Sequence, residues 1–178
     1  MPKMTDEFVN KIFLLEGANI YTEDPDDKGG ATKEGITLAT WQAMGYDKNH
    51  DGHIDKEDIR ILDKNDLKLV MEKFWDTIKA DCLYNQSIAE FWFDWLWGSG
   101  TIAIMKMQSL VAVPADGIVG PRTIVAINNF GDQELLFEGL QRKRLLFVKT
   151  ITDIDHTQAK WLQGWINRIN SFKFSPNQ

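Results

Sequence analysis

Apolar residues recur at helical spacing along most of the chain. Near its start, Phe8, Ile12 and Leu15 lie three or four residues apart, and Thr5 precedes two acidic residues as a helix start signal. This pattern predicts a first helix over residues 5–17. The same periodicity predicts further helices over residues 38–45, 56–62, 64–79, 86–97, 100–112, 121–130, 132–152 and 157–172.

The segment between the first two helices has a different pattern. Residues 18–37 are rich in Gly, Asp, Pro and Thr, which favour turns and leave room for one or two very short strands. The fold class is therefore mainly α. A shift in composition at Gly98-Ser99-Gly100 suggests two helical lobes, over residues 1–98 and 99–178.

Composition narrows the class of protein. The 178 residues are 43% hydrophobic and include seven Trp, which is enough apolar mass for a core and excludes a disordered chain. The net charge of −6 lacks the basic footprint of a nucleic-acid binder. The single cysteine, Cys82, excludes a disulfide framework, and we expect it to be buried.

The sequence also carries expectations about location. No apolar run reaches the ~18 residues of a membrane span, and the start of the chain lacks the basic and apolar regions of a signal peptide. We therefore expect no membrane insertion. We expect synthesis in the cytoplasm, with another component carrying the protein out if it acts outside.

Residues 47–58 fit the pattern of an EF-hand calcium loop. Oxygen-bearing side chains occupy loop positions 1, 3, 5, 9 and 12, and Gly52 stands at position 6, where the loop turns sharply. The expected calcium ligands are the side chains of Asp47, Asn49, Asp51, Asp55 and Asp58 and the backbone carbonyl of His53. In the alternative, these acids only cap a helix that starts near Lys56. An unpaired loop of this kind favours a structural role for calcium.

Glu16 stands at the end of the first predicted helix, directly before Gly17. The negative end of the helix dipole repels a carboxylate there, so a Glu at this position is unfavourable for stability and suggests a functional role. Partial desolvation would favour the protonated form, as a general acid requires. In the alternative, Glu16 is an ordinary solvated surface residue.

A second group of polar residues follows in the turn-rich segment. Asp27 and Thr32 flank the paired glycines Gly29 and Gly30. Paired glycines let a backbone approach a substrate closely, and the Thr32 hydroxyl could hold a water molecule.

These residues resemble the signature of glycoside hydrolase family 108, the bacterial and prophage N-acetylmuramidases. The similar segments are Leu14-Leu15-Glu16-Gly17 and the run from Asp24-Pro25 to Gly35-Ile36-Thr37. The resemblance implies a compact lysozyme-like helical fold with Glu16 as catalytic acid. The order Glu, Asp, Thr also resembles the triplet of phage-type lysozymes, which implies that Asp27 and Thr32 are its partners. Asp24 and Asp26 remain alternatives for the second carboxylate.

The resemblance continues through the second half of the chain. Residues 93–100 are similar to the family's Phe-Asp-x-x-x-Asn-x-Gly segment, which implies that Asp94 and Gly100 bind substrate, as do Gly29 and Gly30. Residues 107–123 and 164–168 are similar to its peptidoglycan-binding helical region. The chain departs from the pattern at Ala18, where the family has a second Gly, at Gly98, where it has Asn, and by two extra residues between Glu16 and Asp24-Pro25.

Two side-chain clusters leave alternatives open. The aromatic run 91–97 has helical spacing, so most of it belongs to a core, with at most one Trp in a substrate cleft. Arg142, Lys143, Arg144 and Arg168 form the basic concentration of an acidic chain. They are either a solvated helix face or a contact to an anionic cell-wall polymer.

The resemblance implies a monomeric lysozyme that cleaves the β-1,4 bond between N-acetylmuramic acid and N-acetylglucosamine. Peptidoglycan is then its partner, and a holin or secretion system its route to the wall. The loop at residues 47–58 adds calcium as a structural cofactor. Two alternatives remain. One is a catalytically weak accessory protein of a secretion system, and the other is a calcium-dependent wall-binding module.

Overall fold

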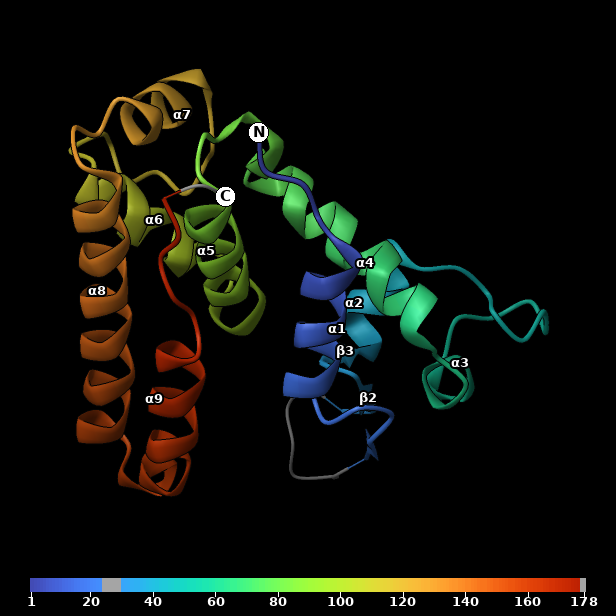
Figure 1. Ribbon diagram of the computed structural model, residues 1–178. Coiled ribbons are helices and arrows are strands. Elements are labelled where there is room, and N and C mark those ends of the chain that lie inside the picture. The colour runs from blue at the N-terminus through green and yellow to red at the C-terminus, as the bar shows by residue number, and fades with distance from the viewer. Residues whose placement is uncertain (24–29, 177–178) are drawn as a thin grey trace. The chain divides into compact units, whose positions relative to one another are not determined.

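The computed structural model describes residues 1–23 and 30–176 and confirms a mainly α fold (Figure 1). The chain forms two compact units, which are described separately. The amino-terminal unit is Met4–Trp75, and the carboxy-terminal unit combines Asp76–Gln178 with Met1–Lys3. The expected division into helical lobes over residues 1–98 and 99–178 stays a prediction.

The amino-terminal unit begins with α1 (Asp6–Leu15). The Thr5 side chain caps this helix by accepting a hydrogen bond from the Phe8 amide at 3.1 Å. Two acidic residues follow in the first turn, where they interact favourably with the positive end of the helix dipole. The buried face of α1 carries Phe8, Val9 and Ile12. The start signal in the sequence is therefore confirmed.

A small antiparallel sheet follows, in the order β1 (Tyr21–Thr22), β2 (Thr32–Lys33) and β3 (Ile36–Thr37). We expected one or two short strands, and the described residues form three. The third strand arises because Glu34 and Gly35 both adopt positive φ and turn the chain back, so that Lys33 pairs with Ile36.

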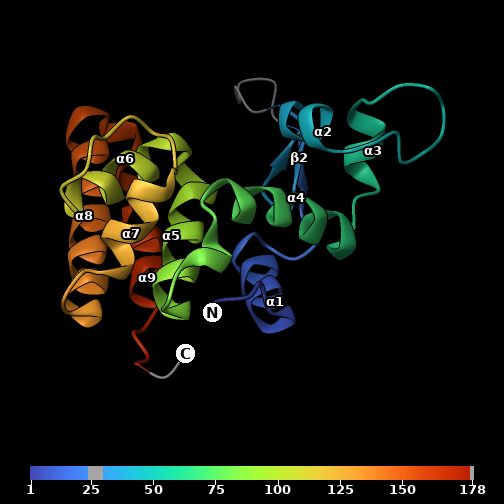
Figure 2. The same ribbon diagram turned by 90° about the horizontal axis from the view of Figure 1, so that it is seen from above.

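Helices α2 (Leu38–Met44), α3 (Lys56–Arg60) and α4 (Lys64–Thr77) complete this unit, with the last two residues of α4 belonging to the other unit. The loop between α2 and α3 extends away from the helices of this unit (Figure 2). Trp41 is fully buried, and its indole N–H donates to the Tyr46 carbonyl at 3.0 Å. Gly45 is required here, because a Cβ would lie 2.2 Å from the Trp41 ring.

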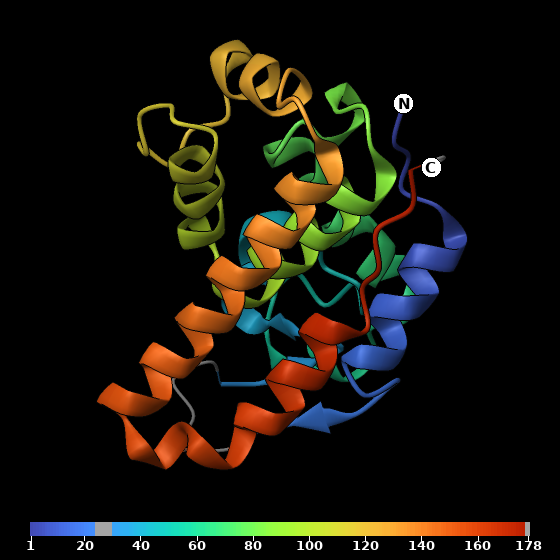
Figure 3. The ribbon, with the colours of Figure 1, turned by 60° about the vertical axis from the view of Figure 1, so that its left-hand side comes forward.

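The carboxy-terminal unit is built around a buried helix. In chain order its elements are the 3₁₀ turn η1 (Ala80–Cys82), α5 (Gln86–Ser99), α6 (Thr101–Leu110), α7 (Pro121–Asn128), α8 (Gln133–Ile154), the 3₁₀ helix η2 (His156–Trp161) and α9 (Leu162–Asn170). Phe91, Trp92, Phe93 and Trp95 of α5 are fully buried, as expected for a core helix, whereas Trp97 is partly exposed. Helix α9 packs alongside α8 (Figure 3).

Two expectations for this unit are wrong. A single helix was expected over 157–172, but its first turns are 3₁₀. The Asp155 side chain accepts the Thr157 amide at 3.0 Å and starts a new helix directly after α8. Cys82 was expected to be buried but is exposed, because Leu83 supplies the buried side chain after η1.

No helix of the described residues is both long enough and apolar enough to span a membrane.

Candidate active site

Glu16 is the C-cap residue of α1. Its backbone N–H donates to the Ile12 carbonyl at 2.9 Å, and its side chain is half-buried. The next three residues, Gly17, Ala18 and Asn19, all have positive φ, at 90°, 44° and 72°. This left-handed run ends the helix and leads the chain into the small sheet, so Glu16 stands at a sharply defined corner.

Thr32 lies in the middle strand of that sheet. It pairs with Thr22 of β1 and with Thr37 of β3, and its hydroxyl donates to the Gly30 carbonyl at 3.1 Å. Because the donor is used, the oxygen remains as an acceptor for a water or a sugar hydroxyl. Gly30 has a φ of 63°, and no atom of the described residues lies within 4 Å of the position of a Cβ. Asp27 and Gly29 lie outside the described residues.

Glu34 is a residue that sequence reasoning missed. It is 1% exposed, and neither carboxylate oxygen has a hydrogen-bond partner within the described part of the chain. Burial raises the pKa of this carboxyl. The available signal was an acidic residue directly before Gly35 in a tight turn between short strands. Because Glu34 is enclosed, it does not offer a carboxylate to a bound glycan.

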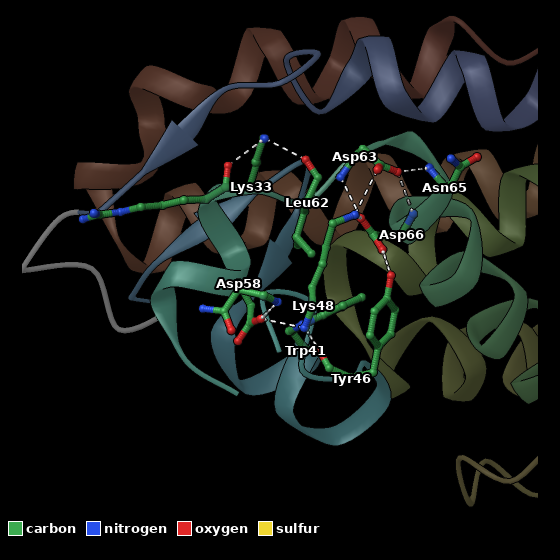
Figure 4. A network of polar contacts seen from close by, with 11 residues as sticks. Lys33, Trp41, Tyr46, Lys48, Asp58, Leu62, Asp63, Asn65 and Asp66 are labelled. Carbon is green, nitrogen blue, oxygen red and sulfur yellow. Dashed lines mark hydrogen bonds and ion pairs between the residues drawn. The ribbon is translucent and has the colours of Figure 1, made fainter. Parts of the chain in front are cut away.

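A polar network ties the loop after α2 to the start of α4 (Figure 4). The Lys48 ammonium binds Asp63 at 2.9 Å and also binds Asp66, which accepts the Tyr46 hydroxyl at 2.9 Å. Burial opposes the charge on Lys48, but its bonds to the two carboxylates outweigh that cost and raise its pKa. Lys33 adds a second tie, because its ammonium donates to the carbonyls of Arg60 and Leu62 at 3.0 and 2.7 Å.

The structure gives the acids of loop 47–58 defined backbone partners. Both oxygens of Asp47 accept amides within the loop, from Asp51 at 3.2 Å and Gly52 at 2.8 Å. Asp55 caps α3 by accepting the Glu57 amide. Asn49 and Asp51 bond to each other at 2.9 Å, and the His53 amide donates to Asp51.

Asp58, the expected ligand at position 12, is fully buried. Its oxygens accept the amides of Lys48, Asn49 and Asp55 at 2.7, 3.1 and 2.9 Å. Burial opposes ionisation, but these three N–H groups together lower the pKa of the carboxyl. Among the described residues no three or more His, Cys, Asp or Glu side chains converge on a metal position. Asp55 and Asp58 thus cap α3, and calcium coordination by this loop stays a prediction.

Asp94 of α5 lies at the centre of the carboxy-terminal unit. It is fully buried, and its carboxylate binds Arg144 of α8 at 2.7 Å and Arg168 of α9 at 2.7 Å. Burial opposes its ionisation, but the two guanidinium charges outweigh burial and lower its pKa. Because Asp94 is enclosed, a substrate at this cluster would contact the arginines rather than the Asp94 carboxylate. Gly100 has a φ of 63° and forms the junction between α5 and α6.

The comparisons with known proteins match both halves of the chain. The family of glycosyl hydrolase 108 matches residues 9–100, which is more than half of the sequence. The chain belongs to glycoside hydrolase family 108. Residues 102–170 match a second family, described as a predicted peptidoglycan domain. This family 108 protein is therefore a muramidase-like peptidoglycan hydrolase, with peptidoglycan as its substrate or partner.

A solved structure, SagA of Brucella abortus, is similar in fold to this family 108 protein. The TM-score is 0.71 at 23% identity, and the match covers 97% of this chain and 98% of that chain. At this identity the likeness shows the fold alone. No curated protein matches the sequence.

Proposed function

We propose that this family 108 protein is an N-acetylmuramidase that cleaves the β-1,4 bond between N-acetylmuramic acid and N-acetylglucosamine, with Glu16 as general acid. The supporting observation is the corner at Glu16. A half-buried carboxyl follows the end of α1, and a left-handed run at residues 17–19 fixes the backbone after it. Glu16 also lies within the matched family segment.

In the proposed reaction Glu16 donates its proton to the glycosidic oxygen as the bond to the sugar breaks. A second carboxylate is needed to stabilise the positive charge that develops on the ring or to activate water. Asp27 is the first candidate, with Asp24 and Asp26 as alternatives. The Thr32 oxygen is proposed to hold a water near the reacting centre, and Gly29 and Gly30 to let the glycan approach the backbone.

The deciding experiment is digestion of purified peptidoglycan by Glu16→Gln. The amide is nearly isosteric but has no acidic proton, so we expect turnover to fall by a factor of ~10² or more with an unchanged thermal midpoint. Glu7→Gln is the matched control, because Glu7 is an exposed carboxylate in the first turn of the same helix. Mass spectrometry of the new reducing ends tests the bond specificity.

Near wild-type turnover by Glu16→Gln would refute the assignment of the acid. Reducing ends on N-acetylglucosamine would refute the muramidase specificity. Binding of peptidoglycan by the wild-type chain without any release of fragments would favour the alternative of a catalytically weak accessory protein.

The proposal includes a route to the wall and a calcium site. We propose synthesis in the cytoplasm as a monomer and passage through a holin or a secretion system, because a net charge of −6 does not attract the protein to an anionic wall. Cell fractionation with and without that partner tests the route. A structural calcium ion in loop 47–58 stays a prediction, with its test given below.

A further inference from the structure

A cluster of polar side chains joins the small sheet of the amino-terminal unit to α3. Glu23 follows β1 directly, and its carboxylate accepts hydrogen bonds from three donors. These are the Tyr21 hydroxyl at 2.7 Å, the Lys56 ammonium at 3.0 Å and Nη2 of Arg60 at 3.0 Å. The Arg60 guanidinium also lies over the Tyr21 ring, 5.3 Å from its centre. Arg60 therefore holds the end of β1 by an ion pair and by a cation–π contact.

Arg60 contacts the neighbouring strand as well. Its backbone carbonyl accepts the Lys33 ammonium of β2 at 3.0 Å, and the Leu62 carbonyl accepts the same ammonium at 2.7 Å (Figure 4). Strands β1 and β2 pair directly, with Thr22 opposite Thr32. The end of α3 is thus bonded to both strands of the pair that carries Thr32.

The strand pair depends on contacts of this kind for a fixed position. Each strand of the sheet has two residues, where ~5–6 are usual, so its own ladder of hydrogen bonds is short. The side chains of Glu23, Lys56 and Arg60 are 36%, 50% and 45% exposed, and exposed ion pairs add little to global stability. Several donors on one carboxylate do fix its orientation, because each bond is directional. The cluster therefore suits positioning better than stabilisation.

We propose that Arg60 is a positioning residue of the active site, which holds the pair β1–β2, and with it the Thr32 hydroxyl, in the geometry for turnover. It acts through Tyr21 and Glu23 rather than on the substrate. The inference rests on the proposed function, because that proposal places Thr32 near the reacting centre. A displacement of about 1 Å in a catalytic site can cost ~100-fold in rate, so loss of this anchor should lower kcat far more than stability.

Three variants isolate the role of Arg60. Arg60→Ala removes the ion pair and the cation–π contact but keeps the carbonyl that binds Lys33. Arg60→Lys is the conservative variant, because it keeps a cation for Glu23. Glu57→Gln is the matched control. Glu57 pairs with Nη1 of the same guanidinium at 3.2 Å from within α3, so its loss leaves the bond from Nη2 to Glu23 in place.

The test is turnover of soluble, uncross-linked peptidoglycan strands by the full chain. We expect kcat of Arg60→Ala to fall at least ~10-fold, with KM within a factor of ~2 and a thermal midpoint near wild type. Arg60→Lys should restore most of kcat, and Glu57→Gln should match wild type. Hydrogen exchange followed by mass spectrometry should be faster in the β1 and β2 peptides of Arg60→Ala and unchanged in α1.

An unchanged kcat in Arg60→Ala, or an equal loss in Glu57→Gln, would overturn the proposal. A rise in KM alone would overturn it too, since Arg60 would then bind the glycan directly. A lower kcat without faster exchange in β1 and β2 would show that Arg60 does not act through the sheet. The exchange measurement needs no substrate. If the wild-type chain releases no glycan fragments, the proposed function fails, and exchange alone decides whether Arg60 anchors the strands.

Discussion

Two residues of the amino-terminal unit, Ala18 and Glu34, have an unusual backbone conformation or burial. Ala18 has a φ of 44°, in the left-handed region, where a Cβ costs ~1–2 kcal/mol. The family's second Gly falls at this position, so the structure explains that part of the pattern. Glu34 adds a buried carboxyl without a partner among the described residues. Ala18 thus reduces stability two residues after Glu16, and Glu34 does so two residues after Thr32.

Ala18→Gly should therefore raise the free energy of unfolding by about 0.5–1 kcal/mol. Relief of the left-handed strain exceeds the added flexibility of the unfolded chain. Urea denaturation measures the change. Gly17→Ala is the control in the opposite direction, because its φ is 90° and a Cβ would lie 3.0 Å from Cδ1 of Ile20. A loss of stability in Ala18→Gly would contradict the strain argument.

Glu34→Gln should stabilise the protein at pH 7 by about 1 kcal/mol. The folded pKa of Glu34 is raised, so wild-type stability is greatest below the unfolded pKa and falls as the pH rises through the folded value. The amide of the Glu34→Gln variant does not ionise, so the stability of the variant does not fall with pH for this reason. Thermal midpoints of the two proteins should therefore converge as the pH falls toward ~4. A constant difference across that range would show that ionisation of Glu34 is not the cause.

At the scale of elements, the loop 47–58 and α3 form one capped unit. Asp58 supplies both the capping box of α3 and the acceptor for the amides of Lys48 and Asn49. Lys48 then reaches Asp63 and Asp66 at the start of α4. The loop thus keeps a defined path through side-chain acceptors for backbone amides.

Asp58→Ala should lower the free energy of unfolding by about 3 kcal/mol, because it leaves buried amides without an acceptor. The pKa of Asp58 is lowered in the folded state, so its contribution is present above its unfolded pKa and is lost as the pH falls through the folded value. Chemical denaturation at neutral and acid pH measures both effects. Asp51→Ala, at an exposed position of the same loop, should cost less than about 1 kcal/mol.

If the loop also binds calcium, millimolar calcium should raise the thermal midpoint, because an ion that binds only the folded state stabilises it by mass action. Asp47→Ala combined with Asp51→Ala should remove that increase. Magnesium at the same concentration controls for ionic strength. An unchanged midpoint and no heat in calorimetry would leave helix capping as the whole role of these acids.

At the scale of the whole molecule, Asp94 joins three helices that are distant in sequence. Its partners Arg144 and Arg168 lie 50 and 74 residues further along the chain. The cluster therefore sets how α5, α8 and α9 meet in the carboxy-terminal unit. Both arginines also line a pocket of that unit.

Asp94→Asn should destabilise the protein by about 3–5 kcal/mol, because Arg144 and Arg168 then lose the negative charge of a buried carboxylate. Glu138→Gln is the control. It breaks the exposed pair of Glu138 and Arg142 at 3.3 Å and should cost less than about 1 kcal/mol. Thermal unfolding compares the two. Equal losses would show that burial adds nothing to the Asp94 cluster.

Much of the fold was predictable because helices are determined by neighbours three or four residues away. The Thr5 cap and the apolar spacing of α1 depend on such local contacts, and so do the proline start of α7 and the acid cap of α8. The third strand was not predictable, because a pair of two-residue strands has almost no periodic pattern. The change from 3₁₀ to α helix in the last helical segment has no periodic signal either.

For the candidate site, the sequence by itself predicts Glu16, Thr32 and the glycines, since these residues form a compact motif within about twenty positions. Only the tertiary structure decided the environment of each charge. In the folded protein Glu34 is enclosed, and Asp58 accepts hydrogen bonds from three backbone amides. Asp94 lies between two arginines. Burial and ion pairing of this kind depend on which distant elements pack together, and periodicity along the chain carries no record of that packing.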